Sequence, residues 1–459
     1  MIQNKETLLE LLETRRYSTF IKAVDELNPV DAAEFLAELP EDKLPVVFRM
    51  LKKDTAAEIF AEFEPDVQEK LITAMTDKEI GGIVEELFVD DAVDMLEEMP
   101  ASVVNTILKN AKPETRAEIN RFLSYPEDSA GSVMTSEFID LKKDMTTTQA
   151  IERIRKIGLD KETIYVAYVT DKSRVLEGVV PLKALLFAKP DDKIGDLMNR
   201  DVIFAYTHDD QETVANLISH YDILALPIVD KEKRLVGIVT VDDALDVLET
   251  EATEDMQKMA AVLPNEKPYL KTGVFATWRQ RIPWLLLLMV SATFTSTIIQ
   301  GYEQAITSIH LAILTAFIPM LMDTGGNAGG QTSVTVIRGL SLGEIQLKDY
   351  FRVVWKELRV AVLCGGTIAI ATFLKVMTID FRWALSYEGK STLIISLVVA
   401  MTIFCAIIFA KLVGASLPIL AKRLKLDPAV MASPFITTIV DTVTLIIYFT
   451  IASRFFQFP

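Results

Sequence analysis

The sequence predicts a multidomain membrane protein, with an all-α superhelical N-terminal domain, a central α/β region and an α-helical transmembrane domain. Three observations lead to this fold class: an uneven charge distribution, two sets of internal repeats and a series of long apolar runs. Residues 1–278 contain 32 Lys and Arg against 55 Asp and Glu, a net charge of −23. Residues 279–459 contain 15 against 9, a net charge of +6. This contrast indicates an acidic soluble region joined to a membrane region.

The overall composition excludes several classes of protein. The 459 residues are 50% hydrophobic and 24% charged. The net charge of −17 argues against nucleic-acid binding. The two cysteines, Cys364 and Cys405, lie in apolar runs and exclude a disulfide framework or a cysteine-based zinc site. The first residues lack a basic segment followed by an apolar one, so we expect no signal peptide and a cytoplasmic N-terminus.

The first 130 residues contain a repeated helical pattern. The segments DAAEFLAELP, TAAEIFAEFEP and DAVDMLEEMP begin at Asp31, Thr55 and Asp91. Each combines helically spaced apolar residues with a capping residue at its start and a proline at its end. The pattern predicts a stacked helical superhelix over residues 1–130, with an ordinary helical bundle as the alternative.

A second duplication spans residues 134–250. The segment YVTDKSRVLEGVVPL (168–182) matches PIVDKEKRLVGIVTV (227–241), and each copy has the order strand, helix, strand, turn, strand, helix. This order resembles a tandem pair of CBS modules, which we expect over residues 131–245. The resemblance implies a nucleotide site, for example for ATP, at Thr240 and Asp243. The first copy has Pro181 and Ala184 at the matching positions, and a purely structural pair is the alternative.

Five apolar runs follow in the domain expected over residues 279–459. They cover residues 283–302, 310–337, 357–378, 391–421 and 430–453. A transmembrane helix needs about 20 predominantly apolar residues, so the runs predict five membrane helices. The second and fourth runs exceed this length, which leaves room for a tilt or a break. The strongly basic connectors fall on one side of an alternating five-helix arrangement. That side is predicted to be the cytoplasm.

An acidic helix is expected where the two regions meet, leading into a connecting segment over residues 246–278. Asp243, Asp246, Glu251 and Glu254 fall within a helical sector of about 140°, with Asp255 beside it. Repulsion between like charges at this spacing favours counter-cations. Oxygen ligands suit Mg²⁺ or Ca²⁺, and a solvated acidic face is the alternative.

Asp441 lies near the middle of the fifth apolar run. An ionised carboxylate facing lipid there costs at least ~2.5–3.5 kcal/mol, so it should face a pore, a cation or a partner. A protonated or hydrogen-bonded Asp that joins helices is the alternative. Asp323 and Asn327 lie in a glycine-rich segment of the second run, PMLMDTGGNAGGQTSV, which permits close helix approach or a polar path. Asp427 precedes a proline and suits a helix cap.

With the GGNAGGQ and PFITTIVD segments, the chain resembles the MgtE family of bacterial magnesium channels over essentially its whole length. The resemblance implies a homodimer in the lipid of the bacterial inner membrane, with several membrane passes and a pore on the two-fold axis. Asp441 of each subunit would hold a hydrated Mg²⁺, and Asn327 and Gly326 would line the same path. The implied function is Mg²⁺-selective uptake, closed by intracellular Mg²⁺.

The same resemblance implies a set of Mg²⁺ ligands outside the pore, of which Ser132 would use its backbone carbonyl. The matching positions are Asp90, Asp94, Glu58, Ser132, Glu212, Asp222, Asp243, Asp246, Glu251, Glu254, Asp255 and Asp427.

Other functional classes are less well supported by the sequence. The chain has no H-E-x-x-H metalloprotease motif and no P-loop, so we expect neither an intramembrane protease nor an ATP-driven pump, and no enzyme. The main alternative is a secondary transporter that couples divalent cations to Na⁺ or H⁺. Asp323 and Asp441 would then serve as its ion-coupled carboxylates.

Overall fold

The computed structural model describes residues 5–40, 42–97, 99–265, 268–308, 313–387, 390–431 and 433–456. The chain divides into two compact units, Met1–Leu248 and Glu249–Pro459.

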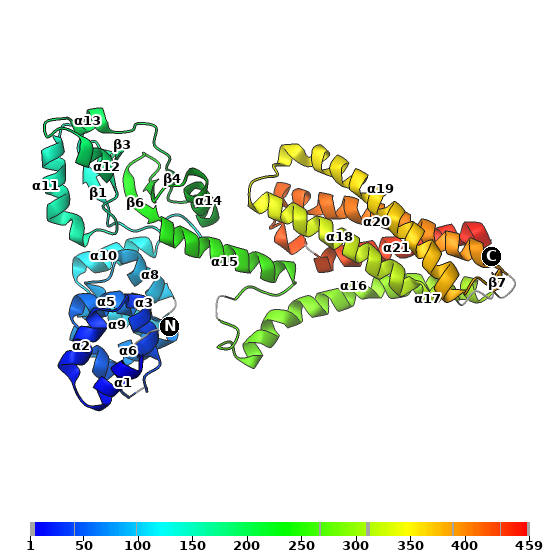
Figure 1. Ribbon diagram of the computed structural model, residues 1–459, viewed down its shortest axis with the longest axis horizontal. Helices are drawn as coiled ribbons and strands as arrows, with labels where there is room; N and C mark the ends of the chain where they lie inside the picture. The colour runs from blue at the N-terminus through cyan, green and yellow to red at the C-terminus, as the bar shows by residue number, and fades with distance from the viewer. Residues whose placement is uncertain are drawn as a thin grey trace. The chain divides into compact units, whose positions relative to one another are not determined.

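The N-terminal part of the first unit is entirely helical (Figure 1). Its helices are α1 (Lys5–Glu13), α2 (Tyr17–Asp25), α3 (Pro29–Ala37), α4 (Leu44–Phe48), α5 (Lys53–Ala61), α6 (Pro65–Ala74), α7 (Asp77–Val84), α8 (Val89–Glu97), α9 (Ala101–Asn110) and α10 (Pro113–Phe122). The three repeated segments form α3, α5 and α8, and α5 packs against both α3 and α8. Phe20, Phe35 and Phe60 are fully buried between the helices.

Two similar α/β modules complete the first unit. The first contains β1 (Ile139–Leu141), α11 (Thr147–Ile157), β2 (Val166–Thr170), β3 (Leu176–Pro181) and α12 (Leu182–Phe187). The second contains α13 (Ile194–Leu197), β4 (Ala205–Tyr206), α14 (Gln211–Tyr221), β5 (Ala225–Val229), β6 (Leu235–Thr240) and the start of α15 (Val241–Met259). Each sheet has one parallel and one antiparallel pairing, with Ile139 opposite Ala167 and Ala205 opposite Ile228. The predicted duplication is confirmed.

The second unit is built from long helices (Figure 1). They are α16 (Val274–Ser308), α17 (Ile313–Ala316), α18 (Ile318–Ser341), α19 (Tyr350–Lys375), α20 (Thr392–Arg423) and α21 (Ser433–Phe456). Helices α18, α20 and α21 pack against one another, α19 packs on α20, and α16 packs on α21. The second apolar run breaks between α17 and α18, where Pro319 occupies the first turn of α18.

Among the residues that the structure describes, four helical segments are long and apolar enough to cross a membrane. They are Val274–Tyr302, Leu347–Asp380, Thr392–Arg423 and Pro428–Phe456. Helix α18, with 24 residues, has the required length, but its polar and glycine residues lower its hydropathy. The fold class is therefore confirmed, whereas the fifth membrane crossing stays a prediction.

Close backbone contact fixes the crossing of α18 and α20. A Cβ atom added at Gly414 would lie 2.4 Å from the carbonyl oxygen of Gly329. A Cβ added at Gly329 would lie 3.2 Å from the carbonyl oxygen of Ala410. Small residues allow membrane helices to approach in this way, and the gain is van der Waals packing.

Gly414→Ala should therefore destabilise the membrane unit by about 1–3 kcal/mol, because neither backbone can move without disturbing the helix pair. Gly366→Ala is the matched control, since no atom lies within 4 Å of the added Cβ. The measurement is the thermal midpoint of the detergent-solubilised protein, followed by size-exclusion chromatography. Equal midpoints for the two variants would contradict the packing argument.

Candidate functional site

Three aspartates lie on α8, of which Asp90 is buried, Asp91 half-buried and Asp94 exposed. Its apolar residues, among them Val89, Val93 and Leu96, are buried in the N-terminal core. The helical spacing places Asp90, Asp91 and Asp94 toward the α/β modules of the same unit. Asp90 is only 8% exposed, and its Oδ1 atom has no hydrogen-bond partner among the described residues.

The negative charges of carboxylates on the modules and on the N-terminal helices act on these aspartates and raise their pKa values. The acids outside α8 whose charges act on them are Glu62, Glu137, Glu162, Asp242, Asp243 and Asp246. We call these six residues, together with Asp90, Asp91 and Asp94, the acidic cluster. It joins residues more than 150 positions apart in the sequence, because the helical N-terminal part packs on the α/β modules.

Burial and mutual repulsion shift the cluster toward its protonated form. Burial, followed by the charges of neighbouring acids, raises the pKa of Asp90 to about 9 and that of Asp94 to about 7. The same causes raise the pKa of Glu162 to about 7 and that of Asp91 to about 6. Burial also raises the pKa of Asp243, although hydrogen bonds from Thr240 oppose it. The cluster therefore holds negative charge only at a free-energy cost that a bound cation would remove.

The cluster is not a preformed chelate. In the part of the chain that the structure describes, no three Asp, Glu, His or Cys side chains converge to hold a metal ion. A loose group of carboxylates suits an ion that keeps part of its water shell, as Mg²⁺ usually does.

The structure places the other soluble ligand candidates in different settings. Glu58 is exposed on α5. Ser132 is buried, and its hydroxyl donates to the Ser129 carbonyl at 2.8 Å. Glu212 lies in the first turn of α14, and Asp222 caps the end of that helix with a left-handed φ of +52°.

Thr240 and Asp243, the predicted nucleotide residues, bond to each other. The Thr240 hydroxyl and its backbone N–H both donate to Asp243 Oδ2. A ribose would have to displace this contact, so the pair is closed in the present structure.

The second half of α15 belongs to the membrane unit, where a lysine pairs with two of the predicted ligands. Lys258 Nζ lies 2.6 Å from Glu254 Oε1 and 2.7 Å from Asp427 Oδ2. Burial opposes the charge of Lys258, but these two carboxylates outweigh it and raise the lysine pKa. An Mg²⁺ at Glu254 or Asp427 would therefore compete with Lys258.

Neighbouring contacts hold this end of α15 against the membrane helices. The Ser341 hydroxyl donates to Asp255 Oδ2 at 2.9 Å. Burial raises the pKa of Asp255, with the charge of Asp427 adding to the effect. Met259 packs on Ile337 and Ala429. Glu251 lies one turn earlier and is half-buried.

Asp441 lies on α21 beside a cavity of about 330 Å³. The cavity lining comes from α16, α18 and α21 and consists of Ala292, Thr295, Ser296, Ile299, Gln300, Met322, Thr438 and Asp441. Asp441 Oδ1 is buried and has no hydrogen-bond partner among the described residues. The charge of Asp323 on α18 acts on it. An unpaired carboxylate in an apolar helix favours a bound cation or a proton.

Helix α18 has two different faces. Asp323, Asn327 and Gln331 follow one another at a spacing of four residues and are exposed; we call these three residues the polar stripe. The opposite face carries glycines that contact α20 and α21. Gly326, predicted to line the path, is buried instead, where an added Cβ would lie 2.9 Å from Thr437.

A buried polar network in the membrane unit was missed by the sequence analysis. Lys411 on α20 is 6% exposed and donates to the Thr332 hydroxyl at 3.1 Å. That hydroxyl also lies 3.0 Å from Glu357 Oε2 on α19, and Lys411 Nζ is 3.9 Å from the same carboxylate oxygen. The sequence contained a signal for this network, because Lys411 lies inside the fourth apolar run and a lysine in such a run requires a polar partner. The sequence analysis also overlooked Lys258.

Together, the fold and these sites define a membrane protein that handles cations and carries an acidic soluble region with paired CBS-like modules. Comparison with known protein families agrees with this class of protein. The family described as divalent cation transporter, MgtE, matches residues 318–451. The MgtE intracellular N domain matches residues 27–128, and the CBS domain matches residues 194–250.

Full-length relatives show the family directly. The chain is 36% identical to the magnesium transporter MgtE of Thermus thermophilus over 450 residues, 97% of each chain. It is 31% identical to that of Bacillus subtilis over 448 residues, 98% of this chain and 96% of the relative. The chain belongs to the MgtE family, whose named relatives are transporters and not enzymes.

Solved structures match the soluble region. The soluble part of a magnesium transporter aligns with a TM-score of 0.53 at 31% identity, covering 55% of this chain and 98% of that one. The cytosolic domain of the Mg²⁺ channel MgtE in complex with ATP aligns with a TM-score of 0.50 at 36% identity, covering 53% and 99%.

The acidic cluster predicts a pH-dependent stability in the absence of divalent cations. Because folding raises the pKa values of these acids, their protonation favours the folded state. This stabilisation of the fold is fully present below about pH 4 and is lost as the pH rises through about 6 to 9. The thermal midpoint of the soluble unit should fall by several degrees from pH 5 to 9, since 1 kcal/mol shifts it by roughly 2–4 °C. Calorimetry of the full chain in EDTA measures this.

Asp90→Asn should flatten that pH dependence, because it removes the group with the largest shift. Glu69→Gln, on the exposed side of α6, should keep the wild-type slope. A wild-type midpoint that stays level or rises over this range would refute the repulsion argument.

Proposed function

We propose that the protein is an Mg²⁺ channel for magnesium uptake that closes when intracellular Mg²⁺ binds its acidic soluble region. The observation that carries the proposal is Asp441, an unpaired carboxylate beside a cavity in an apolar helix. The protein's membership of the MgtE family and the named magnesium transporters among its relatives support Mg²⁺ as the transported ion. A hydrated Mg²⁺ suits such a site, because this ion gives up its water shell reluctantly.

A homodimer accounts for the polar stripe on α18. Exposed to lipid, Asp323, Asn327 and Gln331 would leave polar groups unsatisfied. A second copy related by a two-fold axis would enclose the stripes of both chains around a water-filled path. The Asp441 carboxylates of both chains would then contribute to one ion site. The proposed setting is the bacterial inner membrane, with the N-terminus in the cytoplasm.

Closure follows from the electrostatics of the acidic cluster. Without Mg²⁺, the carboxylates repel one another and oppose packing of the helical part on the α/β modules. With Mg²⁺, cations neutralise them and favour the packed arrangement. To change the ratio of closed to open channels from 1:99 to 99:1, Mg²⁺ must bind the closed state more tightly than the open state by about 5.5 kcal/mol. Several weak Mg²⁺ sites together can supply this binding free energy, and Asp255 and Asp427 contribute to such sites.

Nucleotide binding is a separate part of the proposal. A relative's cytosolic domain has been solved in complex with ATP. In this chain, ATP at Thr240 and Asp243 would have to separate the two side chains and enter the acidic cluster. We therefore expect Mg²⁺ and ATP to compete there.

An ion-coupled secondary transporter is the second candidate. The buried Lys411–Glu357 pair and the proximity of Asp323 to Asp441 are features that such transporters use for proton or Na⁺ coupling. Single-channel currents would favour the channel. Divalent flux that strictly requires an Na⁺ or H⁺ gradient would favour the transporter.

Asp441→Ala should abolish Mg²⁺ flux into proteoliposomes while leaving the amount of folded protein unchanged, because the carboxylate has no structural hydrogen bond to lose at Oδ1. Glu344→Gln, an exposed acid after α18, is the control and should keep wild-type flux. Wild-type flux in Asp441→Ala would refute the proposed ion site.

Combined Asp90→Asn and Asp243→Asn substitutions should leave the maximal current intact and raise the Mg²⁺ concentration for half-closure by about tenfold or more, equivalent to ~1.4 kcal/mol. Patch recordings with varied cytoplasmic Mg²⁺ measure this, with Glu69→Gln as the control. A double variant that closes at the wild-type Mg²⁺ concentration would show that the cluster is not the sensor.

A further inference from the structure

A charged side chain inside the membrane unit is held away from water. Lys411 lies on α20 within the fourth apolar run, and its side chain is 7% exposed. Lysines near the ends of membrane helices usually extend the ammonium group to the water interface. The ammonium of Lys411 instead contacts neighbouring helices, so its charge must be offset inside the unit.

The partners of Lys411 come from two other helices. Its Nζ atom donates to Thr332 Oγ1 on α18 at 3.1 Å and lies 3.9 Å from Glu357 Oε2 on α19. The Thr332 hydroxyl donates to Glu357 Oε2 at 3.0 Å, and its oxygen lies 3.4 Å from the Ala328 carbonyl oxygen. We call the position of the ammonium between Thr332 and Glu357 the Lys411 site. A hydroxyl and a carboxylate from two helices thus converge on one positive charge.

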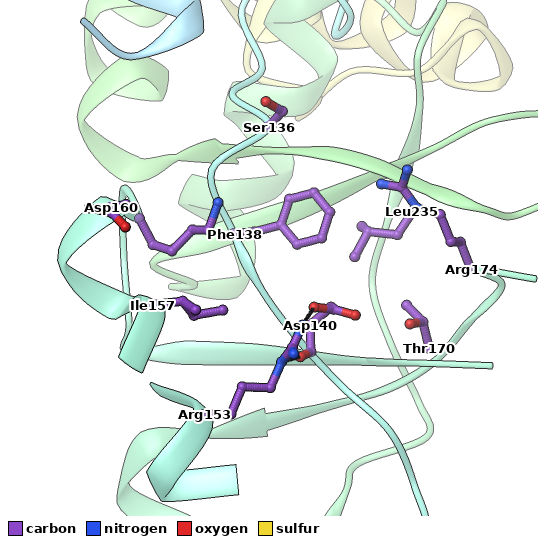
Figure 2. A pocket seen from close by; sticks show the side chains of 10 residues that line it. Ser136, Phe138, Asp140, Arg153, Ile157, Asp160, Thr170, Arg174 and Leu235 are labelled. Carbon is purple, nitrogen blue, oxygen red and sulfur yellow. Dashed lines mark hydrogen bonds and ion pairs between the residues drawn. The ribbon is translucent and has the colours of Figure 1, made fainter. Parts of the chain in front are cut away.

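An ion pair of the soluble unit shows how the Lys411 site differs from a surface pair. Arg153 and Asp140 form a close ion pair that lines a pocket of about 490 Å³ (Figure 2). Their side chains are 41% and 31% exposed, whereas those of Lys411 and Glu357 are 7% and 14% exposed. Water can solvate the members of a surface pair when they separate, so such a pair contributes little to stability. Removing one member of a buried pair leaves an uncompensated charge.

The chemistry of the Lys411 site suits a single positive charge. Carboxylate and hydroxyl oxygens are hard ligands, and membrane transporters hold Na⁺ with oxygen ligands of this kind. One carboxylate balances one positive charge, so a monovalent cation leaves the site neutral. A divalent cation would leave an unbalanced positive charge away from water, which is costly.

Asp441 is the contrasting carboxylate of the same unit. Its Oδ1 atom has no hydrogen-bond partner among the described residues, and it lies beside a cavity of about 330 Å³. Glu357, in contrast, already has a cation of the protein itself next to it. The two carboxylates therefore differ in whether a mobile ion is needed to offset the charge.

We propose that Lys411 is a tethered counter-ion, whose ammonium fills a site that would otherwise bind a monovalent cation such as Na⁺ through Glu357 and Thr332. The protein thereby excludes a mobile cation from Glu357. This inference does not rest on Mg²⁺ transport, since it concerns a different carboxylate from Asp441. It removes Glu357 from the groups available for Na⁺ coupling and leaves Asp323 and Asp441 as the carboxylates of the ion-coupled alternative.

Lys411→Ala in the full chain tests the proposal. The thermal midpoint of the detergent-solubilised protein is measured in EDTA while NaCl or LiCl replaces choline chloride at constant ionic strength. The wild-type midpoint should be the same in all three salts. The Lys411→Ala midpoint should be low in choline and rise by several degrees, with saturation, in Na⁺, because a ligand that binds only the folded state stabilises it.

Two controls separate the Lys411 site from general salt effects. Lys411→Ala combined with Glu357→Gln removes both charges and should be insensitive to the choice of cation. Lys375→Ala removes a lysine that lies 2.8 Å from Asp380 Oδ2 at the end of α19, where the two side chains are 41% and 23% exposed. Because water reaches this exposed pair, the Lys375→Ala midpoint should be the same in Na⁺ and in choline.

Three results would overturn the proposal. The first is a folded Lys411→Ala variant whose midpoint is the same in Na⁺, Li⁺ and choline. The second is a failure to recover folded protein in NaCl and in LiCl for both Lys411→Ala and Lys411→Met, since a mobile cation would then be unable to replace the ammonium. Met is included because it keeps most of the side-chain volume. The third is a saturable Na⁺-dependent rise of the wild-type midpoint that Glu357→Gln abolishes, which would place Na⁺ beside Lys411.

Discussion

Carboxylates held close together and away from water constrain this protein more than any other interaction. In the soluble unit, the buried Asp90 and the half-buried Asp91 and Asp243 lie among other acids, so each negative charge raises the free energy of its neighbours. In the membrane unit, Asp441 has a buried oxygen with no hydrogen-bond donor among the described residues. Both places are stable only if protons or cations offset the charge.

The two units meet this constraint in different ways. In the soluble unit, burial and neighbouring acids raise the pKa values of Asp90, Asp91 and Asp94, which leaves these acids responsive to a diffusible cation. At the far end of α15, Lys258 already bridges Glu254 and Asp427. A protein cation therefore occupies the position where sequence matching places Mg²⁺. Gating by Mg²⁺ at that end would require the lysine to yield, whereas Asp90 Oδ1 in the acidic cluster has no hydrogen-bond partner among the residues described.

Close helix packing gives the membrane unit its rigidity and leaves its polar residues on one face. Glycines at 325, 326, 329 and 414 bring α18 against α20 and α21 at backbone distance. As a consequence, Asp323, Asn327 and Gln331 point away from these helices. The same packing buries Lys411 and Glu357 around Thr332, a network that joins three helices. The packing of this unit thus pairs Lys411 and Glu357 inside it and leaves Asp323, Asn327 and Gln331 on the polar stripe.

The sequence by itself determined the order of the domains, the two duplications and the apolar helices, and it singled out Asp441 as a carboxylate inside an apolar run, because hydrophobic period, charge balance and turn residues act locally along the chain. Tertiary structure decided which acids meet. Asp91, Glu137 and Glu162 joined the acidic cluster, and Gly326 faced Thr437, since these contacts depend on how distant elements pack. The pairing of Lys258 with both Glu254 and Asp427 likewise follows from side-chain directions that spacing along the chain does not fix.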